Sequence, residues 1–225
     1  VGNTFNGSNY DVQVVKFSPQ LAVEWQDTIK GDYNDFGNSI QQTTDGGYVI
    51  CGTKYDGTDE DIMLWKITVT TVDDTDTPSY VTLYNPEAST DNNTIEYGNY
   101  VQQTSDGGYI ICGETDNFGA GGIDIWLIKT DGEGNELWSK TFGDSMSQTG
   151  TFLQETDDSG FIVIGETIGS STQTDIILIK TDNIGIEEWR QVIAEPGSDV
   201  PYPFRNVLSP VQTGKFVLFV FGPDA

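Results

Sequence analysis

The fold is decided by the stretch Gln42-Thr43-Thr44-Asp45-Gly46-Gly47-Tyr48-Val49-Ile50-Cys51-Gly52. It returns almost unchanged as Gln103-Thr104-Ser105-Asp106-Gly107-Gly108-Tyr109-Ile110-Ile111-Cys112-Gly113, and more loosely as Glu155-Thr156-Asp157-Asp158-Ser159-Gly160-Phe161-Ile162-Val163-Ile164-Gly165. Each copy joins a Thr-x-Asp-x-Gly turn to a run of apolar residues, which is the pattern of a β-hairpin. Such self-similarity predicts a repeat architecture.

A second motif, an Asp followed by a mostly apolar run and a Lys, begins at positions that are 50, 63 and 51 residues apart (61−11, 124−61, 175−124). A residue that recurs in every repeat is expected to be structural, because a catalytic residue is needed once per protein. The residues to which we assign a structural role are Asp45, Asp106 and Asp158 of the turn, Asp11, Asp61, Asp124 and Asp175 of the second motif, and Trp25, Trp138 and Trp189, which follow that motif. We expect the matching residues Lys16, Lys66, Lys129 and Lys180 to form ordered pairs at strand ends.

Each repeat divides into predicted strands a to d, rich in Val, Ile, Tyr and Phe and bounded by Gly, Asp and Asn. No segment shows a sustained helical period, so we expect almost no helix. Strand c starts at the repeated Asp, and strand d carries the Trp or its substitute. The other expected strands are a at 36–44, 97–105, 149–157 and 203–210, and b at 48–53, 109–114, 161–167 and 216–221.

Four-stranded units that repeat about every 40 to 50 residues are typical of β-propeller blades. We therefore predict an all-β β-propeller of four-stranded antiparallel blades, with residues 1–225 forming a single domain. Another repeat architecture, such as a solenoid, is the alternative.

The two ends of the chain predict a shared blade. Val1-Gly2-Asn3-Thr4 aligns with the strand b residues Cys51-Gly52-Thr53-Lys54, whereas the C-terminal residues supply only strands a and b. We predict about four blades, one of them built from a and b of the C-terminus and c and d of the N-terminus. The same complementarity between neighbouring molecules would produce a filament.

Residues 70–95 form an insertion that breaks the repeat period. It is expected to lengthen the second blade around its c–d turn, with Tyr80, Val81 and Leu83 in its strand d in place of the Trp pattern. A unique loop on a repetitive scaffold is a candidate contact site. An ordinary solvated loop is the simpler interpretation.

The formal net charge is −25, from 35 acidic and 10 basic residues. Such a chain lacks the basic patch that binds nucleic acid, and it is repelled by anionic lipid. No apolar stretch approaches the roughly 18 residues of a membrane span. The composition favours an extracellular or cell-surface protein, and the start at Val1 agrees with a processed N-terminus or a trimmed sequence. If the chain is exported, the sequons at Asn6 and Asn92 permit glycosylation.

The residue inventory argues against an enzyme. The chain has no histidine, which excludes Ser-His-Asp and Cys-His catalysis and the usual zinc ligands. A glycosidase that uses a pair of carboxylates remains an alternative, although the sequence shows no pair of acids at a position unique to one repeat. Cys51 and Cys112 are expected to be small buried hydrophobes, not a disulfide. Trp65 and Trp126 are less regular and are left as candidates for contact with a ligand.

Calcium is the one cofactor that the sequence suggests. Asp56, Asp59 and Asp61 place carboxylates close together after strand b of the second repeat. The spacing differs from that of an EF-hand loop. Hairpin turns rich in Asp and Gly are the alternative interpretation.

These motifs resemble the secreted prokaryotic β-propeller repeats that contain Asp-Gly-Gly-Tyr-Ile-Ile-x-Gly, Asp-x-x-Leu-Ile-Lys-Thr-Asp and Gly-Asn-x-x-Trp, and residues 98–142 match best. The Thr-x-Asp-x-Gly turn also resembles the Asp-box of sialidase-like propellers, but only Arg190 and Arg205 are present, too few for the arginine cluster of a sialidase. The resemblance implies a propeller of the cell exterior. The acidic composition, the complementary ends and the lack of a reactive constellation favour a non-enzymatic structural or adhesive protein that self-associates into a filament or surface layer. The alternatives are a lectin-like propeller that binds cell-surface glycans and, ranked lower, a glycan hydrolase.

Overall fold

The computed structural model describes residues 1–73, 75–84, 94–168, 174–193, 207–211 and 215–219. Every regular element in these ranges is a β-strand. No helix there is long and apolar enough to cross a membrane. The prediction of an all-β chain is confirmed for these residues.

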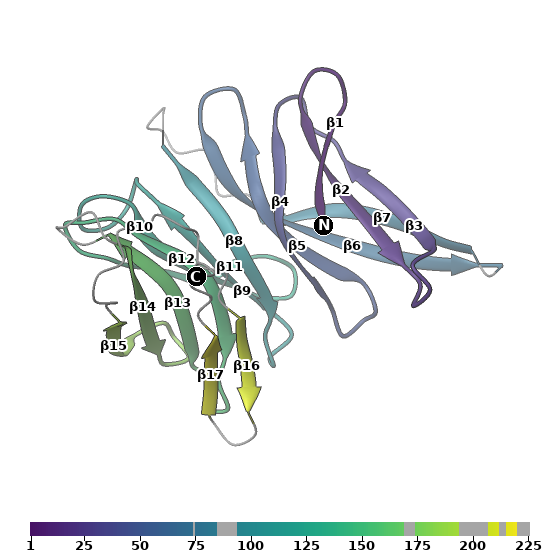
Figure 1. The fold of residues 1–225 in the computed structure, drawn as a ribbon. Helices are drawn as coiled ribbons and strands as arrows, with labels where there is room; N and C mark the ends of the chain where they lie inside the picture. The colour runs from purple at the N-terminus through teal and green to yellow at the C-terminus, as the bar shows by residue number, and fades with distance from the viewer. Residues whose placement is uncertain (74, 85–93, 169–173, 194–206, 212–214, 220–225) are drawn as a thin grey trace, which may run out of the picture.

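The strands form successive antiparallel sheets in chain order (Figure 1). The first sheet has three strands, the second, third and fourth sheets have four each, and a two-stranded hairpin follows. The strands are β1 (Gly2–Phe5), β2 (Tyr10–Phe17) and β3 (Val23–Ile29); β4 (Asp35–Gln42), β5 (Tyr48–Tyr55), β6 (Glu60–Val72) and β7 (Thr75–Tyr84); β8 (Glu96–Gln103), β9 (Tyr109–Thr115), β10 (Asp124–Thr130) and β11 (Glu136–Phe142); β12 (Gln148–Glu155), β13 (Phe161–Ile168), β14 (Thr174–Thr181) and β15 (Glu187–Ile193); β16 (Val207–Val211) and β17 (Lys215–Phe219).

The Thr-x-Asp-x-Gly motif forms the tight turn between strands a and b. In the second sheet, Asp45 accepts hydrogen bonds from the Thr43 hydroxyl (2.5 Å), the Gly47 N–H (3.0 Å) and the Lys66 ammonium (2.8 Å). Gly46 has a φ of 84°, a conformation that glycine adopts without a steric cost. The turn therefore ties the a–b hairpin to the buried lysine of strand c.

Consecutive sheets stack on one another, and we call each such interface a junction. Strands β4, β8 and β12 are the first strands of their sheets, and each lies against the strands of the preceding sheet. At the second junction a Cβ on Gly98 would lie 2.5 Å from Cys51 Sγ, and at the third a Cβ on Gly150 would lie 2.5 Å from Cys112 Sγ. Glycine is required because the backbone of one sheet touches the side chains of the other.

The same polar contact links the first strands of successive sheets. Asn38 Nδ2 donates to the Gly98 carbonyl (2.9 Å), and Asn99 Nδ2 donates to the Gly150 carbonyl (2.9 Å). The second and third junctions therefore share this contact between equivalent residues.

Most of the hydrophobic core in the described residues is divided among the junctions, and a smaller cluster lies within the fourth sheet. The first junction contains Val12, Trp25, Ile50 and Trp65, the second Cys51, Leu64 and Trp126, and the third Cys112, Leu127 and Phe161. Both cysteines are free and fully buried, as predicted. Trp65 and Trp126 are 3% and 6% exposed, so neither is available to a ligand in this conformation.

The insertion forms an extended hairpin in place of a loop up to residue 84. Strands β6 and β7 remain paired from Leu64–Tyr84 out to Val72–Thr75, because the alternation of Thr and Val continues strand β6. Strand β7 contains Tyr80, Val81 and Leu83, as expected, and contacts β3 of the first sheet. The rest of the insertion, residues 85–93, lies outside the described residues.

The predicted sharing of a blade between the two ends differs from the structure. Strand β1 pairs with β2, so the N-terminal residues supply strands b, c and d of the first sheet. The C-terminal strands β16 and β17 pair with each other as a separate two-stranded sheet, drawn apart from β1–β3 in Figure 1. The edge of β2 that a C-terminal strand b would need is already taken by β1. In the first sheet, the outer edges of β1 and β3 are the edges without a paired strand among the described residues.

Candidate cation site

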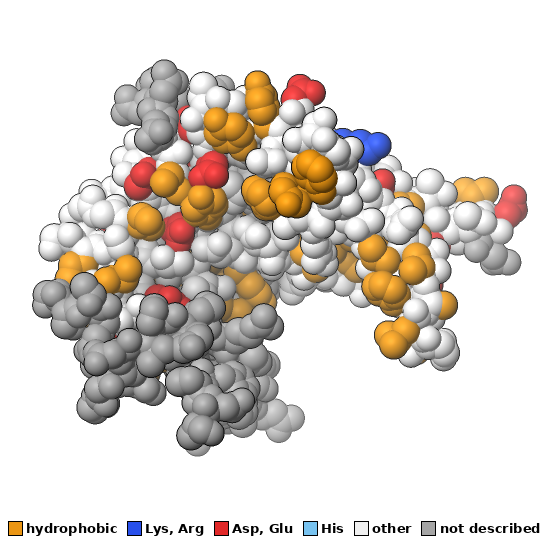
Figure 2. Space-filling view, turned by 45° about the horizontal axis from the view of Figure 1, so that its top comes forward, with side chains coloured by type: hydrophobic (Ala, Val, Ile, Leu, Met, Phe, Trp, Pro, Cys, Tyr) orange, Lys and Arg blue, Asp and Glu red, His pale blue; other side chains and the backbone are white. Residues whose placement is uncertain are grey.

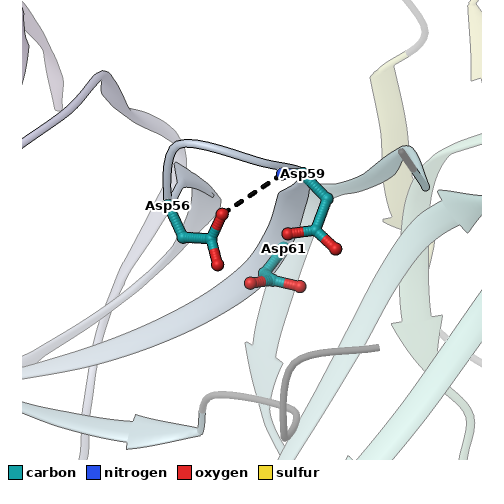
Figure 3. Close-up of side chains that lie close together, drawn as sticks. All are labelled: Asp56, Asp59 and Asp61. Atoms are coloured by element: carbon teal, nitrogen blue, oxygen red, sulfur yellow. Dashed lines mark hydrogen bonds between the residues drawn. The ribbon is translucent and has the colours of Figure 1, made fainter. Parts of the chain in front are cut away.

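The loop between β5 and β6 brings together the three aspartates that the sequence suggested as calcium ligands. One carboxylate oxygen from each of Asp56, Asp59 and Asp61 lies within 4.8 Å of the others. Figure 3 shows the Asp59 and Asp61 carboxylates lying close together on one side of the loop that carries Asp56. The predicted proximity is therefore present.

Asp56 organises the loop. Its Oδ1 accepts hydrogen bonds from the Thr58 N–H (2.8 Å), the Thr58 hydroxyl (2.6 Å) and the Asp59 N–H (3.2 Å). The hydrogen bonds from Thr58, above all that of its hydroxyl, lower the pKa of Asp56 to about 2. Gly57, with a φ of 106°, allows the sharp reversal that lets one carboxylate reach these donors.

Asp59 and Asp61 are buried, with 3% and 5% of their surface exposed. Burial, followed by the neighbouring charges of Asp59 and Asp56, raises the pKa of Asp61 to about 6. Lys54 is the only cation that acts on Asp61 enough to oppose this shift among the described groups. A negative charge at Asp61 is therefore poorly compensated by the protein itself.

A fourth carboxylate, on the next sheet, lies near enough to Asp61 to interact with its charge, although it is outside the group of three aspartates. Glu96 begins β8, is 3% exposed, and has its pKa raised to about 7 by burial and then by the charge of Asp61. Nearby, the Thr94 carbonyl accepts the Glu60 N–H (3.4 Å), and the Thr94 hydroxyl is buried without a partner among the described residues. The acidic cluster thus spans the second junction. Sequence reasoning missed Glu96 because it lies in a different repeat from the loop.

The donor set fits a hard divalent cation. All of the atoms are oxygens, and Ca²⁺ prefers six to eight oxygen ligands, including carboxylates and carbonyls. A bound cation would offset the repulsion among Asp56, Asp59, Asp61 and Glu96. Calcium at this loop remains a prediction.

The repeated residues fall at equivalent places in successive sheets. The ammonium of Lys129 lies 3.0 Å from Asp106, and that of Lys180 lies 3.1 Å from Asp158, as Lys66 lies beside Asp45. The pKa of Asp45 is lowered to about 2, chiefly by the hydrogen bond from Lys66. The pKa of Asp158 is also lowered to about 2, chiefly by the hydrogen bond from the Thr156 hydroxyl.

Lys16 is the exception, because the first sheet has no a–b turn. Its ammonium lies 3.0 Å from Glu24 and 3.8 Å from Asp76 of the extended hairpin. Its side chain is 36% exposed, whereas that of Lys129 is 5% exposed. A lysine at this position is therefore buried only where the turn aspartate is present.

The motif aspartates begin or nearly begin their strands. Asp11, Asp61 and Asp124 are at least 95% buried, and Asp175 of β14 is half-buried. The tryptophans pack across junctions: the rings of Trp25 and Tyr48 are 5.6 Å apart, and those of Trp138 and Phe161 are 5.9 Å apart. Trp189 is 46% exposed.

The two predicted glycosylation positions have different outcomes. Asn6 lies in the β1–β2 turn, where its side-chain amide donates to Asn9 and to Asp11 (2.9 Å). That amide is the group that a glycan would modify. Asn92 lies outside the described residues.

Comparisons with known proteins add no further assignment. No protein-family model matches the chain, and no curated protein matches it.

Proposed function

We propose that this chain is a non-enzymatic structural or adhesive protein of the cell exterior, built as a β-propeller, which assembles into a filament or surface layer through its terminal strands. The observation that carries the proposal is the open edge of β1 together with the separate β16–β17 hairpin. An unpaired strand edge presents backbone groups that recruit a strand from another molecule.

Three features support the propeller arrangement. The sheets follow one another in chain order, their first strands β4, β8 and β12 lie next to one another, and equivalent Asn and Gly residues bridge successive sheets. Repetition of one such rotation arranges the sheets around a common axis, which is the principle of a propeller. The fan of sheets in Figure 1 agrees with such an axis.

The direction of the backbone groups on β1 sharpens the proposal. The Asn6 N–H donates to the Asn9 carbonyl (3.0 Å), so in the alternating antiparallel ladder Thr4 and Gly2 also hydrogen-bond toward β2. The N–H groups of Asn3 and Phe5 consequently point to the open edge. Phe5 is 59% exposed, and its ring lies 5.3 Å from that of Tyr10.

The surface supports an exported, self-associating protein more than a nucleic-acid or lipid binder. The face in Figure 2 carries scattered acidic side chains and very few basic ones, and its hydrophobic side chains form several separate groups. A highly acidic surface resists non-specific association. Specific contacts through strand edges would then decide which molecules assemble.

The assembly experiment uses the purified full chain and Phe5→Pro. Proline removes the outward N–H without removing a donor to β2. We expect the wild-type chain to form oligomers in light scattering at high concentration and ordered particles in negative-stain microscopy, and Phe5→Pro to remain monomeric.

Leu21→Asn is the matched control. Leu21 is 80% exposed in a turn away from the β1 edge, and its φ of 63° suits asparagine. The control should assemble like the wild type. A wild-type chain that stays monomeric under all conditions, or a Phe5→Pro variant that assembles unchanged, would reject strand complementation.

The lectin-like alternative loses one of its supports, because Trp65 and Trp126 are buried. A glycan array probed with the full chain, with and without Ca²⁺, tests it directly. Specific binding to one glycan class, combined with monomeric behaviour in solution, would replace the assembly proposal.

A further inference from the structure

Two buried carboxylates face the first junction outside the aspartate loop described above. Asp11 lies in β2 and is 1% exposed, and Asp35 begins β4 of the next sheet and is 3% exposed. Asp35 Oδ1 is fully buried and has no hydrogen-bond partner among the residues that the structure describes. An orphaned buried carboxylate oxygen is costly and calls for a partner.

Asp35 is directed toward a group of oxygen-bearing residues. The Gly31 N–H donates to Asp11 Oδ1 (3.4 Å), and the Gly31 carbonyl accepts a hydrogen bond from Asn9 Nδ2 (3.0 Å). A Cβ on Gly31 would lie only 2.1 Å from Asp35 Oδ2, so the Asp35 carboxylate lies against the same residue. The Asn9 amide also donates to the Tyr33 carbonyl.

The protein supplies little positive charge here. Burial raises the pKa of Asp35 to about 6, and the charge of Asp11 adds to this shift, while Lys54 is the one cation in the described part of the chain that opposes it. No salt bridge to Asp11 or Asp35 occurs within the described ranges. Asp11 accepts hydrogen bonds from Gly31 and Asn6, whereas Asp35 Oδ1 is buried without a partner, so two charges at this place call for a bound cation or a shared proton.

The geometry points to a Ca²⁺ site between the first and second sheets, with Asp11 and Asp35 as its carboxylate ligands. The Gly31 and Tyr33 carbonyls, which accept hydrogen bonds from Asn9 Nδ2, supply neutral oxygens beside the pair. The Asn6 amide, which donates to Asn9 Oδ1 and to Asp11 Oδ2 (2.9 Å), would turn aside to let these two oxygens bind the cation. A set made only of oxygens, with two carboxylates and several neutral donors, matches the preference of calcium. The cation would add a charged link between two sheets that are already joined by apolar packing and by polar contacts such as that of the Gly37 N–H with Asn3 Oδ1 (3.0 Å).

The sequence around Asp11 repeats the aspartate loop of the second sheet. Asn6-Gly7-Ser8-Asn9-Tyr10-Asp11 aligns without a gap with Asp56-Gly57-Thr58-Asp59-Glu60-Asp61. Gly7 and Gly57 have φ values of 103° and 106°. Asn6 Oδ1 accepts the N–H groups of Ser8 (2.9 Å) and Asn9 (3.1 Å), as Asp56 Oδ1 accepts those of Thr58 and Asp59.

At the third junction, the residue that begins strand a is an amide and not an acid. Gln148 begins β12 where Asp35 begins β4, and its amide donates to Asp144 (2.9 Å) and Thr167 (3.1 Å). An amide can therefore fill this position in a folded junction. We expect Asp35→Asn to fold, and to remove the cation site without removing the junction.

The experiment is calorimetric titration of the chelator-treated full chain with CaCl₂. Wild type should bind Ca²⁺, and Asp35→Asn should bind one equivalent fewer. Asp59→Asn changes the loop of the second sheet and is the control. It should still bind Ca²⁺ at the site between Asp11 and Asp35. Asp35→Asn should also lose part of the calcium-induced rise in Tm, while its Tm in EDTA equals or exceeds that of wild type.

Asn9→Asp is a second variant, which makes the first loop resemble the second and should tighten Ca²⁺ binding about tenfold because it adds a carboxylate. Equal calcium stoichiometry in wild type and Asp35→Asn would overturn the proposal. So would an Asp35→Asn variant that is less stable than wild type in EDTA, since the pair would then be held by a shared proton. If Asp35→Asn fails to fold, unchanged affinity in Asn9→Asp would overturn it.

Discussion

The first and third junctions are built alike in shape and differently in charge. In both, a tryptophan of the earlier sheet contacts an aromatic residue of the later one: Trp25 with Tyr48, and Trp138 with Phe161. At the first junction the buried motif aspartate, Asp11, meets a second carboxylate, Asp35. At the third, Asp124 is buried near Gln148, and both would lie within 3 Å of a Cβ placed on Gly143.

This difference separates what the fold requires from what it tolerates. The apolar contacts and the close approach of the sheets recur, so they define the stacking. The residue that begins strand a varies among Asp35, Glu96 and Gln148, so its charge is not needed for stacking. At each of the first two junctions two acids meet, which is the arrangement that the proposed cation site between Asp11 and Asp35 requires.

The largest effect should come from the shared packing. Trp25→Ala removes a side chain that is 6% exposed and in contact with Tyr48, so we expect a loss of about 3–5 kcal/mol in the free energy of unfolding. Urea denaturation followed by far-UV circular dichroism measures it. Trp189→Ala, at a tryptophan that is 46% exposed, is the control and should cost clearly less. Equal losses would contradict the assignment of Trp25 to junction packing.

The next effect should come from making the third junction acidic. Gln148→Glu places a second carboxylate near Asp124 and removes the amide donors to Asp144 and Thr167. We expect a loss of about 2–4 kcal/mol at neutral pH in EDTA, because a buried charge is left without a partner.

The pH dependence of stability tests whether buried carboxylates without a cation destabilise the fold. The pKa values of Asp35 and Asp61 are raised to about 6 and that of Glu96 to about 7 in the folded chain, chiefly by burial. Between about pH 4 and pH 7 the folded chain then binds more protons than the unfolded chain, so stability in EDTA should fall as pH rises through this window. Thermal melts across it should show a steeper fall for Gln148→Glu and a shallower one for Asp35→Asn. A wild-type Tm that rises with pH in EDTA would contradict the raised pKa values.

A smaller but uniform effect should come from the glycines that allow the sheets to approach. Gly98→Ala and Gly150→Ala each place a Cβ 2.5 Å from a buried cysteine sulfur, so each should cost about 1–3 kcal/mol by overpacking. Gly2→Ala, which has open space around its Cβ, should change stability by less than about 0.5 kcal/mol. The two core variants should lose similar amounts, since steric demands do not depend on junction charge. Urea titrations of the three variants provide the comparison.

The strands could be predicted from the sequence because their signals are local. The Thr-x-Asp-x-Gly turn and the Asp-to-Lys motif mark the ends of β4, β5 and β6 and of their equivalents, and the observed bounds agree within a few residues. The aspartate loop was also visible, because Asp56, Asp59 and Asp61 are close in the sequence.

The contacts between repeats could not be predicted in the same way. Asp35 and Glu96 approach Asp11 and Asp61 only through the stacking of one sheet on the next, and no local pattern gives that rotation. The pairing of β1 with β2 was also not predicted in full. The alignment of the first residues identified β1 as a strand b, but it did not show that β1 occupies the edge of β2 that a C-terminal strand would need. The charge of the residue that begins strand a is the signal that would have drawn attention to the junctions.

The burial of the two thiols turns each cysteine into a reporter of sheet separation. Cys51 Sγ is covered by the glycine-containing segment of β8, and Cys112 Sγ by that of β12. Burial also raises the pKa of both thiols, so neither offers a reactive thiolate while the sheets stay together. The rate at which a thiol reagent modifies each cysteine therefore measures how often its own junction opens, one interface at a time and without an added label.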